Sequence, residues 1–313
     1  MGREDDEEQQ RMPFMPAQED VYGTGSEILA LKVRRRKHDF PLIFAALVLL
    51  MPWGLFVAVY AAMSLSLHYS NPGVSWFIFA LGVVLVLTCA YMAFSGSQLR
   101  GSRDPAWYLV LTSMMLLALV LSTVLGYVNF QHNFWEYYQI LDMQVHKDVD
   151  PVHASGRFLT DAGLISFAPG VALNVDMAGG FRNHHMYCAT PIGASPASGE
   201  YRFWAVGIDC CSSMHGDFHC GDYKTPSARM GVRVLQQEEV AYYHLAVEKA
   251  ESTFGIRAPN PIFFKWVVDS HVYLENRRST GQHYFTIGAW VHLGLQAFLL
   301  AVAWRYYLAP KRM

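Results

Sequence analysis

Four cysteines in a short stretch of the chain are its residues with the greatest capacity for chemistry. They are Cys188, Cys210, Cys211 and Cys220. An even number of cysteines in an oxidising compartment is typical of disulfides. A bond between the adjacent Cys210 and Cys211 would need a strained ring, so we expect Cys188 to bond one of them and Cys220 the other. Two pairings remain open: Cys188–Cys210 with Cys211–Cys220, and Cys188–Cys211 with Cys210–Cys220.

A zinc site is the alternative interpretation of the same stretch. His215 and His219 stand beside Cys220, and zinc in proteins is bound by cysteine and histidine. Their spacing matches no standard zinc module, so we predict disulfides, with neither a metal nor another cofactor. His215, His219 and Cys220 are the ligands to expect if that prediction is wrong.

Other candidates for chemistry in the sequence are weaker. Four residues before the cysteines could converge on a cation: Asp148, Asp150, His153 and Asp161. Carboxylates in loops are usually solvated, so we do not expect them to form a site. The sequence contains no Gly-x-Ser-x-Gly nucleophile motif and no His-Glu-x-x-His zinc motif. We therefore predict that the protein is not an enzyme.

Four long apolar runs flank this stretch, three before it and one after it. They cover residues 40–62, 75–94, 106–128 and 284–306. Each has about the 20 residues that a helix needs to cross a roughly 30 Å hydrocarbon layer. Each is nearly free of charge, because an ionised group at mid-bilayer costs at least about 2.5 kcal/mol. The composition, 52% hydrophobic and 16% charged, agrees. The sequence predicts a membrane α-helical bundle with four transmembrane helices.

Basic residues flank these runs in a consistent pattern. Five of them stand before the first run: Lys32, Arg34, Arg35, Arg36 and Lys37. Others lie between the second and third runs and after the fourth: Arg100, Arg103, Arg305, Lys311 and Arg312. Because basic residues near membrane ends stay cytoplasmic, both termini are predicted in the cytoplasm. The five residues before the first run also predict a membrane-surface contact with anionic lipid headgroups.

The predicted parts of the chain follow from these runs. Residues 1–38 form a disordered cytoplasmic tail with a polybasic juxtamembrane segment, and residues 39–130 hold three transmembrane helices. Residues 131–283 form the large outer or lumenal domain. Residues 284–307 are the fourth transmembrane helix, and residues 308–313 are a second cytoplasmic tail. The four paired cysteines all fall in the outer domain.

One polar pair lies within the fourth apolar run. His292 is followed one helical turn later by Gln296. A single histidine is a poor proton or ion pathway, and the runs lack the broken helices typical of transporters, so a channel or carrier is disfavoured. We expect His292 to hydrogen-bond Thr112, Ser113 or Ser122 of a neighbouring helix.

The pattern of residues 131–283 predicts a large α+β, disulfide-linked domain. Short runs rich in β-branched and aromatic residues indicate strands at residues 157–160, 163–167, 171–175, 185–189, 201–208 and 231–235. Residues 236–254 have helical periodicity, and Gly255 should end that helix. Residues 261–273 are predicted as a second helix. The aromatic stretches 203–206 and 263–268 could form a contact surface, although the core of the domain is the favoured interpretation.

The order of the runs resembles that of tetraspanins, in which both termini are inside and a large cysteine-bearing loop lies between spans three and four. The adjacent Cys210 and Cys211 are similar to the paired cysteines of that loop. A serine instead of a glycine follows the pair, and Cys188 precedes it. The resemblance is an analogy of span order only.

Residues 157–266 also resemble a group of uncharacterised multispan membrane proteins abundant in dinoflagellates and other alveolates. The matching motifs lie at residues 164–167, 186–192, 203–211, 217–221, 228–233 and 260–266. They include the Asp-Cys-Cys sequence that ends at Cys211. Because no activity is established for that group, the resemblance implies a multispan protein with a Cys-Cys outer domain and implies no chemistry.

Together these patterns predict an integral membrane protein of the plasma membrane or of a secretory-pathway organelle. Its disulfide-stabilised outer domain should mediate protein interaction or membrane organisation without catalysis. The expected partners are the lipid bilayer and other membrane or extracellular proteins, and nucleic acid is not among them. An accessory or metal-handling component of a membrane transport system is the alternative function.

Overall fold

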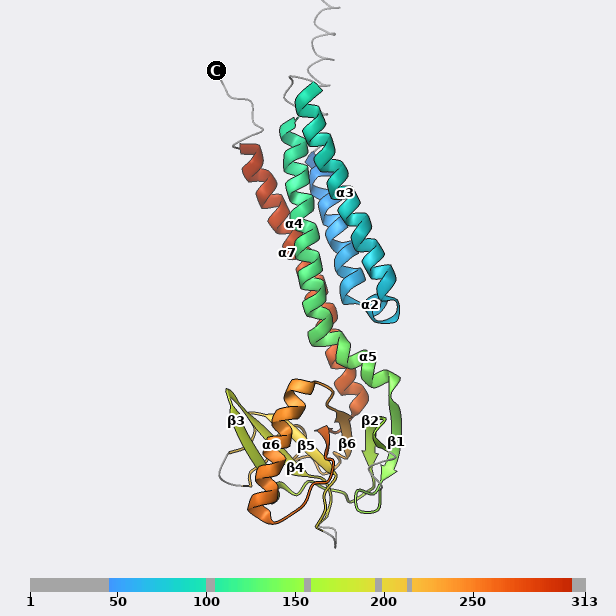
Figure 1. The fold of residues 1–313 in the computed structure, drawn as a ribbon, viewed down its shortest axis with the longest axis vertical. Helices are drawn as coiled ribbons and strands as arrows, with labels where there is room; N and C mark the ends of the chain where they lie inside the picture. The colour runs from blue at the N-terminus through green and yellow to red at the C-terminus, as the bar shows by residue number, and fades with distance from the viewer. Residues whose placement is uncertain (1–44, 100–104, 155–158, 195–198, 213–215, 306–313) are drawn as a thin grey trace, which may run out of the picture.

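The computed structural model describes residues 45–99, 105–154, 159–194, 199–212 and 216–305. It consists of a long bundle of helices with a sheet domain at one end (Figure 1). The predicted tails at 1–38 and 308–313, and with them the basic residues 32–37, lie outside the described residues.

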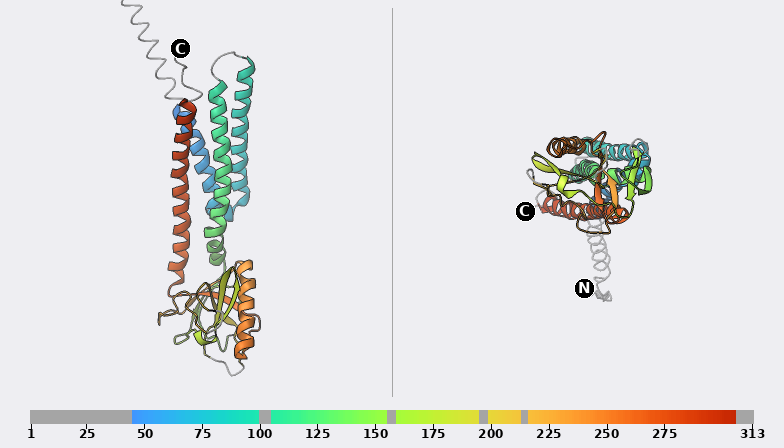
Figure 2. Two further views of the ribbon diagram at one scale, coloured as in Figure 1. Left: turned by 90° about the vertical axis from the view of Figure 1, so that its left-hand side faces the viewer. Right: turned by 90° about the horizontal axis from the view of Figure 1, so that it is seen from below.

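Four helices are long and apolar enough to cross a membrane. They are Ala45–Ser64, Pro72–Ser95, Tyr108–Asp142 and Ser270–Ala303. The second lies within α3 (Pro72–Leu99), the third includes most of α4 (Pro105–Asn129), and the fourth is α7 (Ser270–Ala303). The short helix α2 (Ser66–Ser70) precedes α3. The four apolar runs expected from the sequence thus form four long helices, which Figure 2 shows from the side and from the sheet end.

The polar pair in α7 does not have the predicted partner. His292 and Gln296 contact each other, with 2.8 Å between their Nε2 atoms, and the imidazole stacks on Phe56 of the first helix. Ser113 and Ser122 instead donate to carbonyl oxygens of their own helix. The expected contact between His292 and a neighbouring hydroxyl was therefore wrong. Side chains four residues apart share one helix face, and a serine in a helix can bond its own backbone.

The helices are joined by buried amides at the end that meets the sheet domain. Asn129 Nδ2 donates to Ser64 Oγ at 2.6 Å and to the Gly281 carbonyl oxygen at 3.0 Å. Asn133 Nδ2 donates to Asn129 Oδ1 at 2.8 Å. From there the chain passes through a π-helical turn, Phe130–Phe134, into helix α5, Trp135–Asp142. The first helix, α4 and α7 are therefore held together immediately before the domain begins.

The domain contains a seven-stranded mixed sheet in the order β1-β2-β6-β7-β5-β4-β3. The strands are β1 (Gln144–Val149), β2 (Ala162–Phe167), β3 (Gly179–Asn183), β4 (His185–Pro191), β5 (Phe203–Ile208), β6 (Met230–Arg233) and β7 (Ile262–Val267). β1 pairs with β2, and β5 with β7, in parallel, and the other pairs are antiparallel. Helix α6 (Gln237–Phe254) lies across β3 and β4 (Figure 1). It ends at Gly255, as expected, with φ of +68°.

Loops cover one face of the sheet, and helix α6 covers the other. Ile262, Phe264 and Trp266 of β7 belong to the core on the face covered by loops. Phe263, between them, belongs to the core beneath α6. This alternation has a period of two, which is the strand period, so the helix predicted at 261–273 was wrong in its first half. Helix α7 begins at Ser270, where the Asp269 side chain accepts hydrogen bonds from the next turn.

Most of the other expected strands are confirmed. β2 and β4 cover the predictions at 163–167 and 185–189, and β5 and β6 overlap the predictions at 201–208 and 231–235 without residues 201–202 and 234–235. The prediction at 171–175 was wrong, since Leu173 makes an isolated bridge to Ile192. The prediction at 157–160 begins outside the described residues, and its end is not a strand. β1 and β3 were not predicted, because β1 is an exposed polar edge strand and β3 begins with two glycines, which are poor strand formers.

Candidate functional site

The strands β3, β4 and β5, at one side of the sheet, leave space for sulfur atoms. Cys188 in β4 is the register partner of Gly180 in β3 on one side and of Gly207 in β5 on the other. A Cβ atom on Gly207 would lie 2.8 Å from Cys210 Sγ, and one on Gly180 would lie 3.1 Å from Cys211 Sγ. The two glycines therefore make room for the cysteines that follow β5.

A tight turn directs those cysteines back over the sheet. Asp209 follows β5 with φ of +56°, a left-handed conformation that is rare for residues other than glycine. Its carboxylate accepts a hydrogen bond of 2.8 Å from the Met186 amide and lies 2.8 Å from His185 Nδ1. These two contacts, the amide first, hold the pKa of Asp209 below its usual value. Both carboxylate oxygens thus tie the turn to β4.

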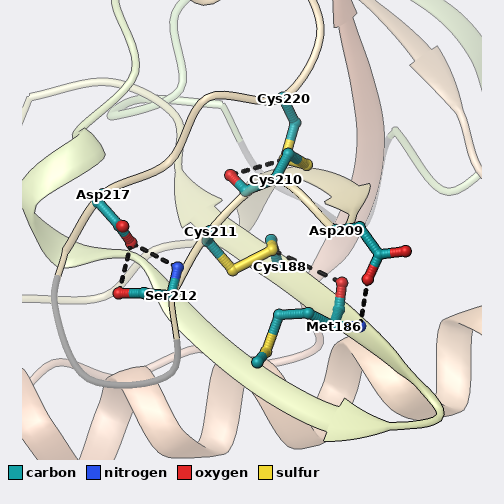
Figure 3. Close-up of a disulfide and its surroundings, with 8 residues drawn as sticks. All are labelled: Met186, Cys188, Asp209, Cys210, Cys211, Ser212, Asp217 and Cys220. Atoms are coloured by element: carbon teal, nitrogen blue, oxygen red, sulfur yellow. Dashed lines mark hydrogen bonds between the residues drawn. A yellow bond between two sulfur atoms is a disulfide. The ribbon is translucent and has the colours of Figure 1, made fainter.

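Two disulfides occupy this space, and Figure 3 shows their cysteines. Cys188 is bonded to Cys211, and Cys210 to Cys220. The Cα atoms are 5.8 Å and 5.2 Å apart, within the roughly 4.4–6.8 Å range usual for disulfides. This is the second of the two pairings left open by the sequence. The Cys188–Cys211 bond fastens the loop after β5 to β4, and the Cys210–Cys220 bond closes that loop on itself.

The same loop covers one face of the sheet. Asp217 Oδ1 accepts hydrogen bonds from the Ser212 amide at 2.7 Å and from the Ser212 hydroxyl at 3.1 Å. The His219 amide donates to the Cys210 carbonyl oxygen at 2.9 Å. Phe218, between them, is 1% exposed and packs into the core. The disulfides therefore lie between the sheet and a loop that the domain needs as its cover.

Sulfur atoms of the two different disulfides lie close to one another, which two separate disulfides do not require. Those of Cys188, Cys210 and Cys220 all lie within 4.8 Å of one another. His219 does not belong to this group, and its ring lies 5.9 Å from the ring of Tyr223. His215 lies outside the described residues, so the zinc ligands predicted as His215, His219 and Cys220 stay a prediction.

The acidic residues before the cysteines form separate pairs instead of one cation site. The pairs are Asp150–His153 at 2.6 Å, Asp148–Arg229 at 3.1 Å and Asp161–His146 at 3.4 Å. A shared cation would need these carboxylates to meet, and each has a basic neighbour of its own. The structure therefore does not bring Asp148, Asp150, His153 and Asp161 together at one point.

The aromatic stretches of β5 and β7 lie in the core. Phe203, Trp204 and Phe264 are each at most 1% exposed. In the second stretch Val268 is 39% exposed, but it follows the last residue of β7. The favoured interpretation of residues 203–206 and 263–268 is confirmed, and a contact surface must be sought elsewhere.

A buried carboxylate joins the sheet to the helices. Glu136 in α5 has a side chain 6% exposed. Its Oε2 accepts a hydrogen bond of 3.2 Å from Arg277 Nη2 of α7, and its Oε1 lies 3.7 Å from Lys265 Nζ of β7. Burial lowers the pKa of Lys265, but the charges of Glu136, Tyr273 and Glu239 together outweigh burial and hold that pKa above its usual value. Three elements that are distant in sequence thus share one buried ionic contact.

An open groove lies beside this contact. Its volume is about 370 Å³, and it is lined by Tyr137, Leu141, His271, Val272, Leu274 and Glu275. Leu141 is 50% exposed and Val272 is 56% exposed. α5 and the start of α7 therefore present apolar side chains to the surroundings at the junction of helices and sheet.

No protein-family model, curated protein or solved structure matches this chain. The resemblances in span order to tetraspanins and in motifs to the dinoflagellate group stay predictions.

Reasoning from the sequence missed the Glu136 contact. The available signal was a charged residue beside aromatic residues at two of the three positions. Glu136 follows Phe134 and Trp135, and Lys265 stands between two aromatic residues, whereas Arg277 is one of several charged residues near the start of α7. A charge in such a setting needs a partner, but the sequence does not show that these three charges meet.

Proposed function

We propose that this chain is an integral membrane protein that holds an outer α+β domain near the membrane surface, where the domain contacts other membrane or extracellular proteins and performs no catalysis. The contact of Glu136 with Lys265 and Arg277 carries the proposal. A domain joined to the helices by a flexible linker needs no buried ionic contact with those helices. This domain has one, so it is held in a fixed orientation suited to presenting a surface.

The outward-facing side chains of the helices support insertion into lipid. Phe77, Leu87, Trp290 and Phe298 are each more than 60% exposed. Exposure of large apolar side chains to water is unfavourable by about 1.5–3 kcal/mol each, and lipid removes that cost. We propose the plasma membrane or a secretory organelle as the site of insertion.

The orientation follows from the basic residues. Arg100 and Arg103 belong to the loop between the second and third spans, so that loop is cytoplasmic under the positive-inside rule. The link between the first two spans is at the other end of the bundle, where Tyr69 of α2 stacks on Tyr138 of α5 at 5.2 Å. That end, with residues 131–283, is then outside the cell or in an organelle lumen.

The groove of α5 and α7 is the proposed contact surface. Leu141 and Val272 offer apolar area, and His271 and Glu275 border it with polar groups. An apolar centre with a polar rim is the usual arrangement of a protein interface. The proposed occupant is an apolar segment of another membrane or extracellular protein, because the groove lies where the domain meets the membrane helices.

Photo-crosslinking in membranes of the source cell tests this surface. A photoreactive residue at Val272 should give one discrete protein adduct. The same residue at Leu245 of α6, which is 38% exposed and does not line the groove, should give none. The adduct from Val272 should be lost in a Leu141→Glu background and kept in a Leu245→Glu background. Adducts to lipid alone, or equal adducts from both positions, would contradict the proposal.

A second candidate function is that of an accessory or metal-handling component of a membrane transport system. It is supported by the sulfur atoms of Cys188, Cys210 and Cys220, which lie within 4.8 Å of one another. The chemistry of that group can be tested without knowledge of the partner.

A further inference from the structure

We infer that the four cysteines of the outer domain form one site with two states: two disulfides when oxidised, and a thiolate site for a soft metal cation such as Zn²⁺ when reduced. The inference does not depend on the proposed contact surface, and it deepens the second candidate function, which rests on the same sulfur atoms. It rests on where the sulfur atoms lie.

The distances between the sulfur atoms suit a metal after a small contraction. Cys188, Cys210 and Cys220 have sulfur atoms within 4.8 Å of one another. Zinc binds thiolates at about 2.3 Å in a tetrahedron, so ligand sulfur atoms lie roughly 3.8 Å apart. The fourth sulfur, that of Cys211, is bonded to Cys188 Sγ. Once both bonds are reduced, small rotations of four side chains bring four thiolates around one cation.

The sheet keeps the site together in the reduced state. Cys188 is held by the hydrogen-bond ladders of β4 with β3 and β5. Gly180 and Gly207 have no side chains, so the space next to Cys188 stays open. Asp209 anchors the start of the cysteine loop to β4 through two contacts that contain no sulfur. The cysteines therefore stay near one another without the disulfides. This lowers the free-energy cost of bringing the four ligands to one metal ion.

The conversion from the disulfide state to the metal-bound state is balanced in electrons and protons. Each disulfide takes up two electrons and two protons from an external dithiol, which is oxidised to its own disulfide. Cys210 and Cys211 are partly exposed, so a reductant can reach one sulfur of each bond. The four resulting thiols then release their protons as they bind the cation, because thiolates are the ligands.

Cobalt spectroscopy tests the inference with the full chain in detergent. The protein is reduced with a phosphine under inert gas, and Co²⁺ is added as the probe. One Co²⁺ per chain should give a near-ultraviolet thiolate-to-cobalt charge-transfer band and the visible bands of tetrahedral cobalt. Zn²⁺ should abolish both. Cobalt held by histidines lacks the charge-transfer band, so the two kinds of site are distinguished.

Two matched variants separate the site from other thiols. Cys89→Ser removes the free cysteine of α3 and should leave the spectrum unchanged, whereas Cys188→Ser should abolish the charge-transfer band. Far-ultraviolet circular dichroism of the reduced protein shows whether the sheet persists. Bound Zn²⁺ should also protect the four outer thiols, but not Cys89, from alkylation. Four freely alkylated thiols without tetrahedral cobalt bands, in folded or unfolded protein, would overturn the inference.

Discussion

Replacing Glu136 with glutamine is expected to destabilise the junction between sheet and helices by about 3–5 kcal/mol, the usual effect of breaking a buried ion pair. The glutamine has nearly the same shape, so the loss is electrostatic. Lys265 would keep a charge on a side chain 21% exposed with its nearest counter-charge removed. Urea unfolding in detergent, followed by near-ultraviolet circular dichroism, measures the change.

An exposed pair in α7 provides the matched control. Glu275 lies 3.6 Å from Arg278, with side chains 61% and 44% exposed, so Glu275→Gln should cost about 0–1 kcal/mol. Substituting both Glu136 and Lys265 with methionine should recover part of the stability lost in Glu136→Gln, because no uncompensated lysine remains and Arg277, which also loses its carboxylate, has a side chain 36% exposed to solvent. If Glu136→Gln and Glu275→Gln unfold at the same urea concentration, the ionic contact does not hold the junction.

Replacing Cys188 with serine is expected to destabilise the sheet domain by about 2–5 kcal/mol, the typical cost of losing a native disulfide. The change removes a link between β4 and the loop that covers one face of the sheet. It also leaves the Cys211 thiol without its partner. The four apolar helices should be unaffected, because no contact of Cys188 reaches them. Thermal unfolding under non-reducing conditions measures the loss.

Cys89→Ser is the control for that substitution. Cys89 is a free cysteine in α3, so its replacement should leave the melting temperature of the sheet domain nearly unchanged. A Cys188→Ser protein that melts with the parent would show that the disulfide contributes nothing to the domain. The same result would leave the cobalt experiment intact, since that experiment begins from reduced protein.

The helices could be predicted because length and the absence of charge are properties of a single segment. The disulfide pairing could be narrowed to two schemes but not chosen. The choice depends on Gly180 and Gly207 standing on either side of Cys188, and this register is set by pairing between strands. Sequence spacing carries no information on which strands become neighbours.

The strand β7 was misassigned for a related reason. Lys265 interrupts a run of aromatic residues and makes its alternation hard to distinguish from a helical pattern. In the structure Lys265 is on the same face as Phe263 and Val267, where it meets Glu136. A charge in a buried strand is tolerated only with a partner, and that partner is more than a hundred residues earlier in the chain.

Labelling of sealed vesicles tests most directly whether four helices cross the membrane with residues 131–283 outside. A membrane-impermeant maleimide is added to right-side-out vesicles that carry either Val152→Cys or Lys311→Cys, with the unsubstituted chain as background. Val152 lies in the domain and is 44% exposed, so Val152→Cys should be labelled at once. Lys311→Cys should be labelled only after detergent is added. Immediate labelling of Lys311→Cys with protection of Val152→Cys would contradict the account.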